Sequence, residues 1–400
     1  MNLSKFISNL LSLGSINMIS LLIPIVTLPI LTRALGVDGY GVLMLINTIN
    51  IFGVIVLDYS SQTFGIREYK VSKEKNKFYY DVQSARLLLL LVYFIFVYIY
   101  VCLFVDYVSG SYVIYYVLPY LLGMYLTAQW FHLCNSELLY VSVLSIIARL
   151  INLIGILLFV KKPEDLTFSL AICTIPVLVT GFIVNYLRCS KHKLEKFHFS
   201  NPIKVFKDGF SIFISDFAPN LYNNIPVIIY ASSSSSSQFA FFALATRIVN
   251  IIMLVQNIIM KASYPILLDK TIRMRNIILS NVVLSIFLVL LLFVFKNDIL
   301  TIITGGHNFS SALIIVDILL IGVIFNGVIY SLTYGYLYKM KIDTLLSKVM
   351  LRACFLSSLI VLILSYSYDV IGLSLGLTMS RVVIALTLYV LYVKNKNITF

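Results

Sequence analysis

The sequence predicts an all-α polytopic membrane protein of about twelve transmembrane helices in two six-helix lobes. Of its 400 residues, 60% are hydrophobic and only 12% charged, whereas soluble domains carry about 25% charged residues. Apolar runs of the length that one spanning helix needs, about 20 residues, recur along the whole chain. They centre near residues 21, 51, 95, 121, 149, 176, 220, 250, 286, 323, 358 and 382.

The longest polar interval predicts the domain organisation. It extends over roughly twenty residues from Arg188 to Lys207, too few for a soluble domain. We therefore predict an N-terminal lobe at 1–187, a cytoplasmic linker loop at 188–208 and a C-terminal lobe at 209–400. An even number of helices in each half makes both lobes enter the membrane in the same direction, as parallel repeats do in several transporters.

The basic residues predict the orientation of the chain. With the N-terminus inside and the sides alternating after each helix, most of the 30 Lys and Arg fall on one side, in loops such as 67–77 and 188–207. Positive charge marks the cytoplasmic side, so both termini are expected in the cytoplasm. This topology explains the net charge of +13 better than nucleic-acid binding, because the cations are spread over separate loops. The first apolar segment lacks a small-residue cleavage site and is expected to be retained.

Cysteine and histidine do not predict a metal or catalytic site. The five cysteines have no CxxC pair, and the four histidines are dispersed, which is unlike the ligand spacing of zinc sites. We interpret the cysteines as small apolar fillers. No metal, no cofactor and no catalytic residue is predicted, and the chain is expected not to be an enzyme.

Polar residues at bilayer depth are the candidate binding residues, because an ionisable group there costs about 2.5 to 3.5 kcal/mol and usually faces a bundle interior. Helical spacing places several of them on shared faces. The candidates for a substrate-binding cavity are Arg247, Asn250, Asn257, Lys261, Arg149, Arg381, Asn47, Asn50, Asn220 and Asn223. The candidates for ion coupling or ion pairing are Asp58, Asp216 and Asp317.

Each candidate has a structural alternative. The amides could simply join helices by hydrogen bonds, and the aspartates could be proton or Na⁺ sites, partners of the arginines or residues at helix ends. A guanidinium stays charged in proteins, so the three arginines imply either an anionic ligand or buried ion pairs. Pairing of Arg149 or Arg381 with Glu137, Asp317 or another carboxylate within about 4 Å would favour the structural role.

Prolines in corresponding helices of the two halves suggest bending points. Pro24 and Pro29 lie in the first predicted helix, and Pro219 and Pro226 lie in the seventh. Each proline frees a backbone group, which suits either gating helices or static kinks.

Three stretches of sequence resemble a known family. Residues 22–36, LIPIVTLPILTRALG, followed by DGYG at 38–41, are similar to the first helix and loop of the O-antigen flippases, the Wzx-type polysaccharide exporters. Asp58 ahead of Gly65-Ile66-Arg67 is a second match. The third is residues 239–247 followed by Tyr264-Pro265. Together with the helix count, the resemblance spans the whole chain.

The resemblance implies a transporter of the multidrug, oligosaccharide-lipid and polysaccharide exporter superfamily, with the MATE-like polysaccharide exporter fold and a central cavity lined mainly by helices 1, 2, 7 and 8. It further implies a flippase of the bacterial inner membrane that moves an undecaprenyl-pyrophosphate-linked O-antigen or related repeat unit to the outer leaflet by alternating access. Its partners would be the lipid-linked oligosaccharide, membrane lipids and other polysaccharide assembly proteins. H⁺ or Na⁺ coupling is open, since no Walker-type nucleotide loop exists in the chain.

Two other functions stay open at this point. A cation-coupled multidrug antiporter of the same fold would favour an acidic or aromatic cavity over one with several arginines. An O-antigen polymerase would ordinarily need substantial outer loops that carry catalytic groups, and the outer loops expected here are short. The sugar composition of a substrate cannot be deduced from the sequence, because a few hydrogen bonds spread over many helices would determine it.

Overall fold

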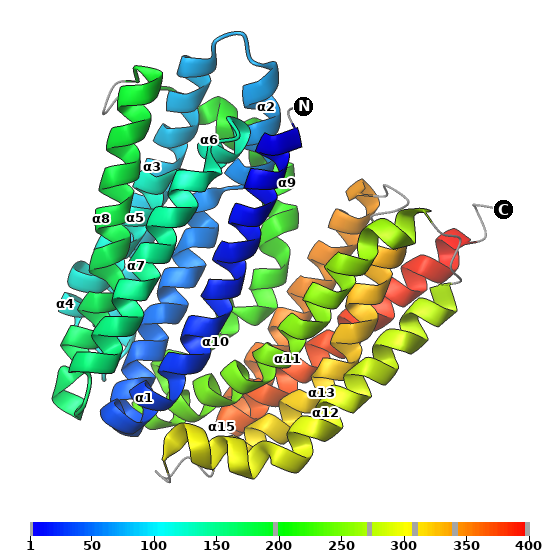
Figure 1. Ribbon diagram of the computed structural model, residues 1–400. Helices are drawn as coiled ribbons and strands as arrows, with labels where there is room; N and C mark the ends of the chain where they lie inside the picture. The colour runs from blue at the N-terminus through cyan, green and yellow to red at the C-terminus, as the bar shows by residue number, and fades with distance from the viewer. Residues whose placement is uncertain (1–2, 195–198, 270–273, 306–310, 338–342, 397–400) are drawn as a thin grey trace. The chain divides into compact units, whose positions relative to one another are not determined.

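The computed structural model describes residues 3–194, 199–269, 274–305, 311–337 and 343–396. Every regular element in these ranges is a helix (Figure 1). Nine described segments are long and apolar enough to cross a membrane, which confirms the all-α polytopic fold. Two of them, Val26–Val71 and Lys348–Lys394, have 46 and 47 residues, about twice the length that one crossing needs. The count of twelve helices stays a prediction.

The chain forms two compact units, Met1–Asp216 and Phe217–Phe400. The boundary lies within one helix, α9 (Ile203–Asn223). The lobes predicted at 1–187 and 209–400 are not tested by this division and stay a prediction.

Unit 1 is a bundle of long helices with short helical turns at its ends. Its first helix breaks at Gly36, whose φ of 67° is one that glycine adopts readily. The elements before α9 are α1 (Leu3–Asp58), η1 (Ser61–Gly65), α2 (Ile66–Val71), α3 (Lys75–Phe104), α4 (Gly110–Tyr112), η2 (Val113–Val117), α5 (Leu118–Thr127), α6 (Gln129–Cys134), α7 (Leu138–Phe159), η3 (Pro163–Asp165) and α8 (Leu166–His192).

Helices α5 and α8 cross at van der Waals distance because both carry glycine at the crossing. A Cβ built on Gly181 would lie 2.5 Å from the Gly123 carbonyl oxygen, and one built on Gly123 would lie 2.6 Å from the Val177 oxygen. Small residues of this kind allow close backbone approach between membrane helices. α7 packs beside α8 and α1.

Unit 2 is arranged around α13, which packs against α11, α12 and α15. The last helix breaks at Tyr368 and Asp369, where φ is −134° and 50°. The elements after α9 are α10 (Ile225–Ser233), α11 (Ser236–Asp269), α12 (Met274–Thr304), α13 (Ser311–Leu332), η4 (Thr333–Leu337) and α15 (Asp343–Lys396).

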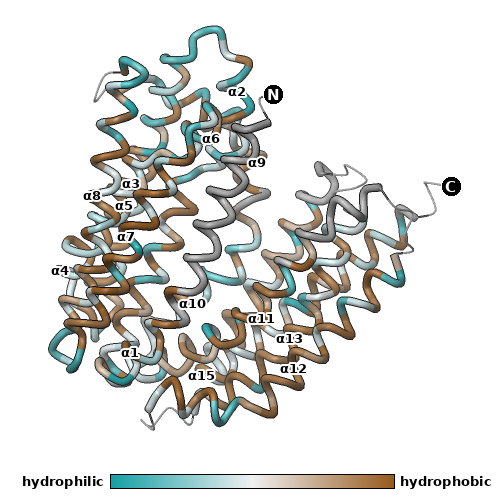
Figure 2. Tube along the Cα trace, in the orientation of Figure 1, coloured by the Kyte–Doolittle hydropathy of each residue, from teal (hydrophilic) through white to brown (hydrophobic). Residues whose placement is uncertain are grey.

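Hydropathy shows how the helices are suited to a bilayer. The long helices are hydrophobic along most of their length, and hydrophilic residues collect mainly toward their ends (Figure 2). In α3 the uninterrupted apolar run starts at Leu87 and continues to Phe104, a rise of about 27 Å at 1.5 Å per residue, close to the hydrocarbon thickness. Arg86 therefore marks one membrane boundary of unit 1.

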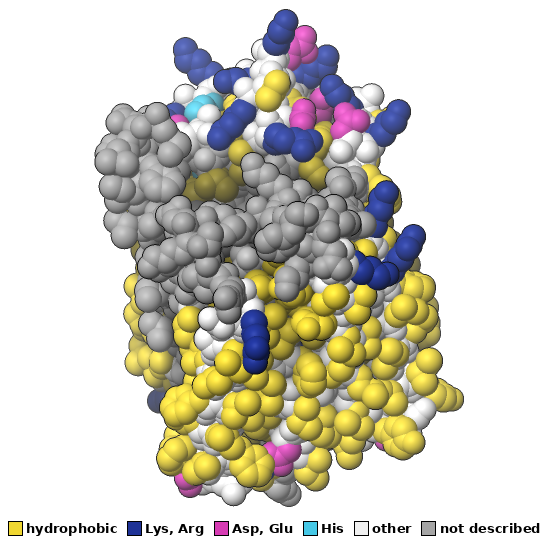
Figure 3. Space-filling model, turned by 90° about the vertical axis from the view of Figure 1, so that its right-hand side faces the viewer, with side chains coloured by type: hydrophobic (Ala, Val, Ile, Leu, Met, Phe, Trp, Pro, Cys, Tyr) yellow, Lys and Arg dark blue, Asp and Glu magenta, His cyan; other side chains and the backbone are white. Residues whose placement is uncertain are grey.

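Beyond Arg86 lies what we call the basic end of unit 1: α2, α6, the loop at 72–74, the first three turns of α3 and the last turn of α8. Lysine and arginine side chains gather at one end of the surface, whereas hydrophobic side chains cover much of the rest (Figure 3). A small aromatic core holds this end together, with Trp130, Phe131, Tyr69 and Tyr79 in mutual ring contact. Local packing, and not the bilayer, shapes these segments.

Candidate functional site

The candidate amides of α1 differ in their environment. Asn50 is 3% exposed, and its Oδ1 has no hydrogen-bond partner. An unpaired buried acceptor of this kind costs about 1 to 3 kcal/mol. Asn47 is half-buried. The side-chain oxygen of Asn50 therefore does not join two helices by a hydrogen bond.

Asp58 ends α1 and is engaged locally. The Ser61 hydroxyl donates a hydrogen bond to its carboxylate, and Asp58 is an electrostatic neighbour of Arg86 on α3. The next two residues, Tyr59 and Ser60, have φ values of 41° and 56°, so the chain turns sharply here. The Tyr59 hydroxyl donates to the Phe206 carbonyl of α9 at 2.9 Å. Asp58 therefore lies in a packed corner of unit 1.

Two arginines that the topology count assigned to inner loops are buried instead. Arg86 and Arg188 are 5% and 0% exposed. Arg86 donates to two successive carbonyls at 3.2 Å each, and Arg188 donates to the next two at 2.9 and 3.1 Å. The acceptors are the carbonyls of Met124, Tyr125, Leu126 and Thr127.

These four acceptors are the last four residues of α5. A helix leaves its last four carbonyls without an intrahelical partner, and its C-terminus carries partial negative charge that favours a cation. Two side-chain oxygens accept further hydrogen bonds: that of Gln83 from Arg86 at 2.7 Å, and that of Asn185 from Arg188 at 2.5 Å. The two guanidinium groups thus stabilise a helix end at the membrane boundary and are not available to a ligand.

Arg149 lies in the middle of α7 and is half-buried. It forms no ion pair with any carboxylate that the structure describes, and its electrostatic neighbour is the phenol of Tyr120 on α5. On the same side of α7, Asn152 donates to the Ile172 carbonyl of α8 at 3.2 Å. Asn152 is therefore a helix-joining amide, whereas Arg149 is a cation at membrane depth with no acidic partner.

Glu137, one expected partner of Arg149, is engaged elsewhere. Its carboxylate lies 3.1 Å from the Lys191 Nζ and 3.0 Å from the His192 Nε2. Burial alone would raise the pKa of Glu137, but the hydrogen bonds from His192 and Lys191 outweigh it and bring the pKa below its ordinary value. This cluster ties the start of α7 to the end of α8 at the basic end.

In unit 2, the candidate residues of α11 differ in their environment. Arg247 is half-buried, and its Nε is covered without a hydrogen-bond partner. Asn250 is exposed. Asn257 accepts a hydrogen bond from the Tyr334 hydroxyl at 3.2 Å, so this amide has a structural partner. The side chain of Lys261 lies outside the described residues.

Sequence reasoning missed the polar network on the opposite face of α11. Gln256 is 0% exposed and donates to the Ser285 hydroxyl at 2.7 Å and to the Val323 carbonyl at 3.1 Å. Asn326 donates to the Gln256 carbonyl oxygen at 3.2 Å. These bonds join α11, α12 and α13. In the sequence, the only sign of this network is a glutamine, Gln256, within a largely apolar run.

Arg381 on α15 is 7% exposed, and its Nη1 is buried without a hydrogen-bond partner. The expected partner, Asp317, is instead contacted through both carboxylate oxygens by the Lys296 Nζ, at 2.6 Å. The hypothesis that Asp317 neutralises Arg381 is therefore wrong. Arg381 forms no ion pair with any carboxylate in the described part of the chain.

The polar residues of α9 have local partners where they are described. Asn224 donates to the Asn220 Oδ1 at 2.7 Å, and Asn223 is hydrogen-bonded to the side chain of Tyr222. The side chain of Asp216 lies outside the described residues. These contacts join neighbouring turns of the chain and leave a ligand role for Asn220 and Asn223 as a prediction.

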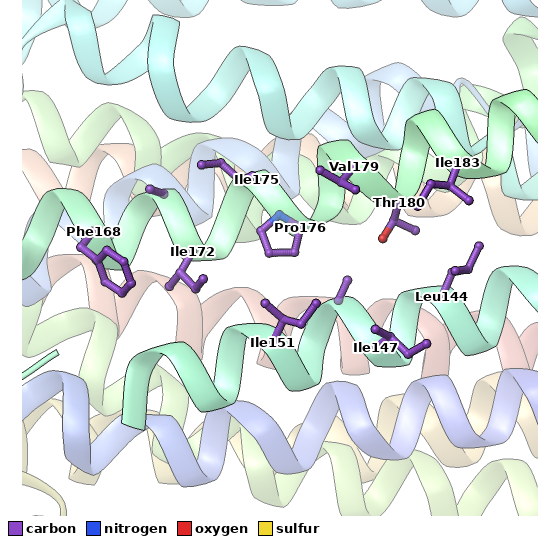
Figure 4. A pocket seen from close by; sticks show the side chains of 12 residues that line it. Leu144, Ile147, Ile151, Phe168, Ile172, Ile175, Pro176, Val179, Thr180 and Ile183 are labelled. Carbon is purple, nitrogen blue, oxygen red and sulfur yellow. The ribbon is translucent and has the colours of Figure 1, made fainter. Parts of the chain in front are cut away.

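A groove of about 350 Å³ lies between α7 and α8 in unit 1 (Figure 4). Its lining side chains, among them Ile151, Phe168 and Ile172, are apolar except for Thr180. Such a surface suits hydrocarbon and not a charged group. Within the described residues no group of three or more His, Cys, Asp or Glu side chains could hold a metal ion.

Comparison with known proteins places the chain in a family. The family described as "Polysaccharide biosynthesis protein" matches residues 6–271. The chain belongs to this family. A protein of Escherichia coli (strain K12) named "Putative O-antigen transporter" is 23% identical over 98% of this chain and 97% of its own length. A protein of the same name from Shigella dysenteriae is 25% identical over 60% of this chain and 62% of its own length.

Solved structures show the same fold. The lipid II flippase MurJ in an inward closed conformation has a TM-score of 0.72 at 16% identity, over 98% of this chain and 88% of that one. The MATE multidrug transporter DinF-BH has a TM-score of 0.62 at 18% identity, over 98% and 95%. The predicted resemblance to the Wzx-type polysaccharide exporters is confirmed by the family match and by the two relatives named as O-antigen transporters. The chain is a multi-pass membrane transport protein of the polysaccharide exporter type and not an enzyme.

Proposed function

We propose that this transporter is a flippase that carries an undecaprenyl-pyrophosphate-linked O-antigen or related repeat unit from the cytoplasmic to the outer leaflet of the bacterial inner membrane. The observation that carries the proposal is that two arginines at membrane depth lack an acidic partner in the described part of the chain. Arg149 and Arg247 are half-buried and have no acidic partner among the described residues. A charge held at this depth is expensive, so its retention without a partner favours an anionic ligand.

The chemistry of a pyrophosphate fits each of these side chains taken by itself. Guanidinium groups donate several hydrogen bonds in a fixed planar geometry that matches phosphate oxygens. The exposed amide of Asn250 lies one turn after Arg247 on α11 and could donate to the sugar. The apolar surfaces of the bundle leave the lipid tail in the bilayer, so only the head group needs a polar route. Lys261 and Asp216 remain candidates from the sequence alone.

Transport is proposed to proceed by alternating access, in which α1 bends at Pro24 and Pro29 and α9 bends at Pro219. The energy source is not assigned to a residue. Asp58 is engaged by Ser61 and neighbours Arg86, which argues for a structural role and against free exchange of H⁺ or Na⁺ there. The partners proposed are the lipid-linked oligosaccharide and the other proteins of polysaccharide assembly, with both termini in the cytoplasm.

The test is a deletion strain complemented with charge variants, followed by analysis of the lipid-linked repeat unit in each leaflet. Deletion should leave the repeat unit on the cytoplasmic side. Arg247→Glu should fail to restore export because a carboxylate would repel the pyrophosphate, whereas Arg247→Lys should restore part of it. Arg67→Glu changes the same charge at an exposed position and should export normally.

Two results would refute the proposal. Normal outer-leaflet delivery in the deletion strain would exclude the flippase function. Near-normal export by Arg247→Glu, at matched abundance in the membrane, would show that Arg247 does not hold the head group. A deletion strain with intact polysaccharide that becomes sensitive to cationic drugs would instead support the multidrug antiporter.

A further inference from the structure

Arg381 is the most deeply buried unpaired cation among the described residues of unit 2. It is 7% exposed, and the guanidinium packs against α13, where a Cβ built on Gly322 would lie 2.8 Å from Nη1 and 3.0 Å from Cδ. One turn earlier on α15, the Thr378 hydroxyl donates to the Ile318 carbonyl at 2.9 Å and fixes the two helices together. The position of Arg381 is therefore set by tight packing and not by an ion pair.

The described part of unit 2 does not balance this charge. Asp317 is engaged by Lys296, and Asp298 and Asp369 are exposed at other places in the fold. The groups that act electrostatically on Arg381 are the phenol side chains of Tyr222 and Tyr330, and neither is a carboxylate. A buried charge without a partner is strongly unfavourable, which favours a counter-ion from solution.

The surroundings limit what that counter-ion can be. Gly322 closes one side of the guanidinium, and Tyr222 is itself buried. An enclosed position of this kind excludes a pyrophosphate with its attached sugar and lipid and favours a small ion. We propose that Arg381 binds a small monovalent anion of the halide class in the core of unit 2, with the hydroxyl groups of Tyr222 and Tyr330 as further donors.

This site is independent of the proposed head-group cations. Arg149 and Arg247 are only half-buried, whereas Arg381 is 7% exposed. The proposal takes Arg381 out of the predicted substrate cavity and gives it a different ligand. It makes no use of transport, so it can fail or hold whatever substrate the protein carries.

The experiment compares thermal unfolding of the purified full-length protein in sodium bromide and in sodium gluconate at equal ionic strength. A ligand that binds only the folded state raises Tm by mass action, and a rise of about 2 °C is expected for a chain of 400 residues when bromide is present at roughly ten times its Kd. Arg381→Met removes the charge at similar volume and should abolish the difference between the two salts. Arg247→Met is the matched control and should keep it.

Equal Tm values of the unchanged protein in bromide and gluconate would overturn the proposal, and so would a bromide effect that survives in Arg381→Met. Inorganic pyrophosphate is the third probe, and stabilisation by it that is lost in Arg381→Met would overturn the argument from size. If Arg381→Met does not fold, Tyr330→Phe decides the matter. A severalfold higher bromide concentration at half-maximal stabilisation supports the site, and an unchanged one overturns it.

Discussion

The crossing of α5 and α8 makes a sharp prediction about Gly181. An alanine Cβ there would lie 2.5 Å from the Gly123 carbonyl oxygen and 2.8 Å from its Cα, and ordinary contact begins at 3.4 Å. Both obstacles are backbone atoms, so the helices must separate by roughly 0.9 Å to restore ordinary packing. No side-chain rotation can relieve the overlap.

The free-energy cost follows from this separation. Overpacking of this kind costs about 1 to 3 kcal/mol. The same movement would lengthen the bonds from Arg188 on α8 to the Leu126 and Thr127 carbonyls of α5, now 2.9 and 3.1 Å, and a weakened charged hydrogen bond costs about 1 kcal/mol or more. Alanine regains about 1 kcal/mol of helix propensity. The net destabilisation is about 2 kcal/mol, which for a chain of 400 residues corresponds to a decrease in Tm of roughly 2 to 3 °C.

The assay is thermal unfolding of detergent-solubilised Gly181→Ala with Gly65→Ala as the matched control. A Cβ on Gly65 meets its nearest atom, Cε3 of Trp130, at 3.4 Å, so this substitution should change Tm little or raise it. Gly123→Ala, whose Cβ would lie 2.6 Å from the Val177 oxygen, should behave like Gly181→Ala. An unchanged Tm for Gly181→Ala, or an equal loss for Gly65→Ala, would refute the close crossing.

Three further substitutions test other parts of the structure. Glu137 has a folded-state pKa below its ordinary 4.5, so its carboxylate stabilises the fold above that value and loses the effect as pH falls through the folded pKa. Glu137→Gln should therefore lower Tm at neutral pH and match the unchanged protein in acid; a pH-independent difference would contradict this. Arg188→Lys should cost about 2 kcal/mol in unfolding free energy, because one ammonium cannot replace the planar donor set on two carbonyls and Asn185; a stability equal to that of the unchanged chain would argue against the cap. Gln256→Leu should lower the free energy of unfolding by about 2 kcal/mol, because Ser285 and Asn326 lose their hydrogen bonds to Gln256. Hydrogen exchange in α11 to α13 should become faster. Unchanged exchange would show that these bonds do not join the three helices.

The sequence was sufficient for the fold class because long apolar runs depend little on tertiary detail. It could not place Arg86 and Arg188, since the rule for basic residues counts charge on each side of the membrane and does not describe the environment of a side chain. Their role depends on where α5 ends. That end is made by Ala128 with a φ of 41°, and an alanine gives no sign of a helix terminus where glycine would have done so.

Helical spacing explains why Gln256 was missed on α11. Residues 247, 250 and 257 share one side of a helix at 100° per residue, although Asn250 is exposed whereas Asn257 accepts a hydrogen bond from Tyr334. Gln256 is nine positions after Arg247, about half a turn around the helix, so a search for one polar stripe excludes it. Its role became visible only when α12 and α13 supplied Ser285, Val323 and Asn326 as partners. Periodicity shows which residues share a face but not what that face contacts.

The arginines of this chain can be separated by how their charge is compensated. Arg86 and Arg188 are buried but meet the carbonyls of a helix end, so the protein itself supplies the negative partial charge. Arg381 is equally buried and meets no such group. Arg149 and Arg247 keep part of their surface open. Because a membrane protein can retain an uncompensated charge only at a cost in stability, we propose anions from outside the chain as partners of the last three residues, whereas the first two have their partners within the fold.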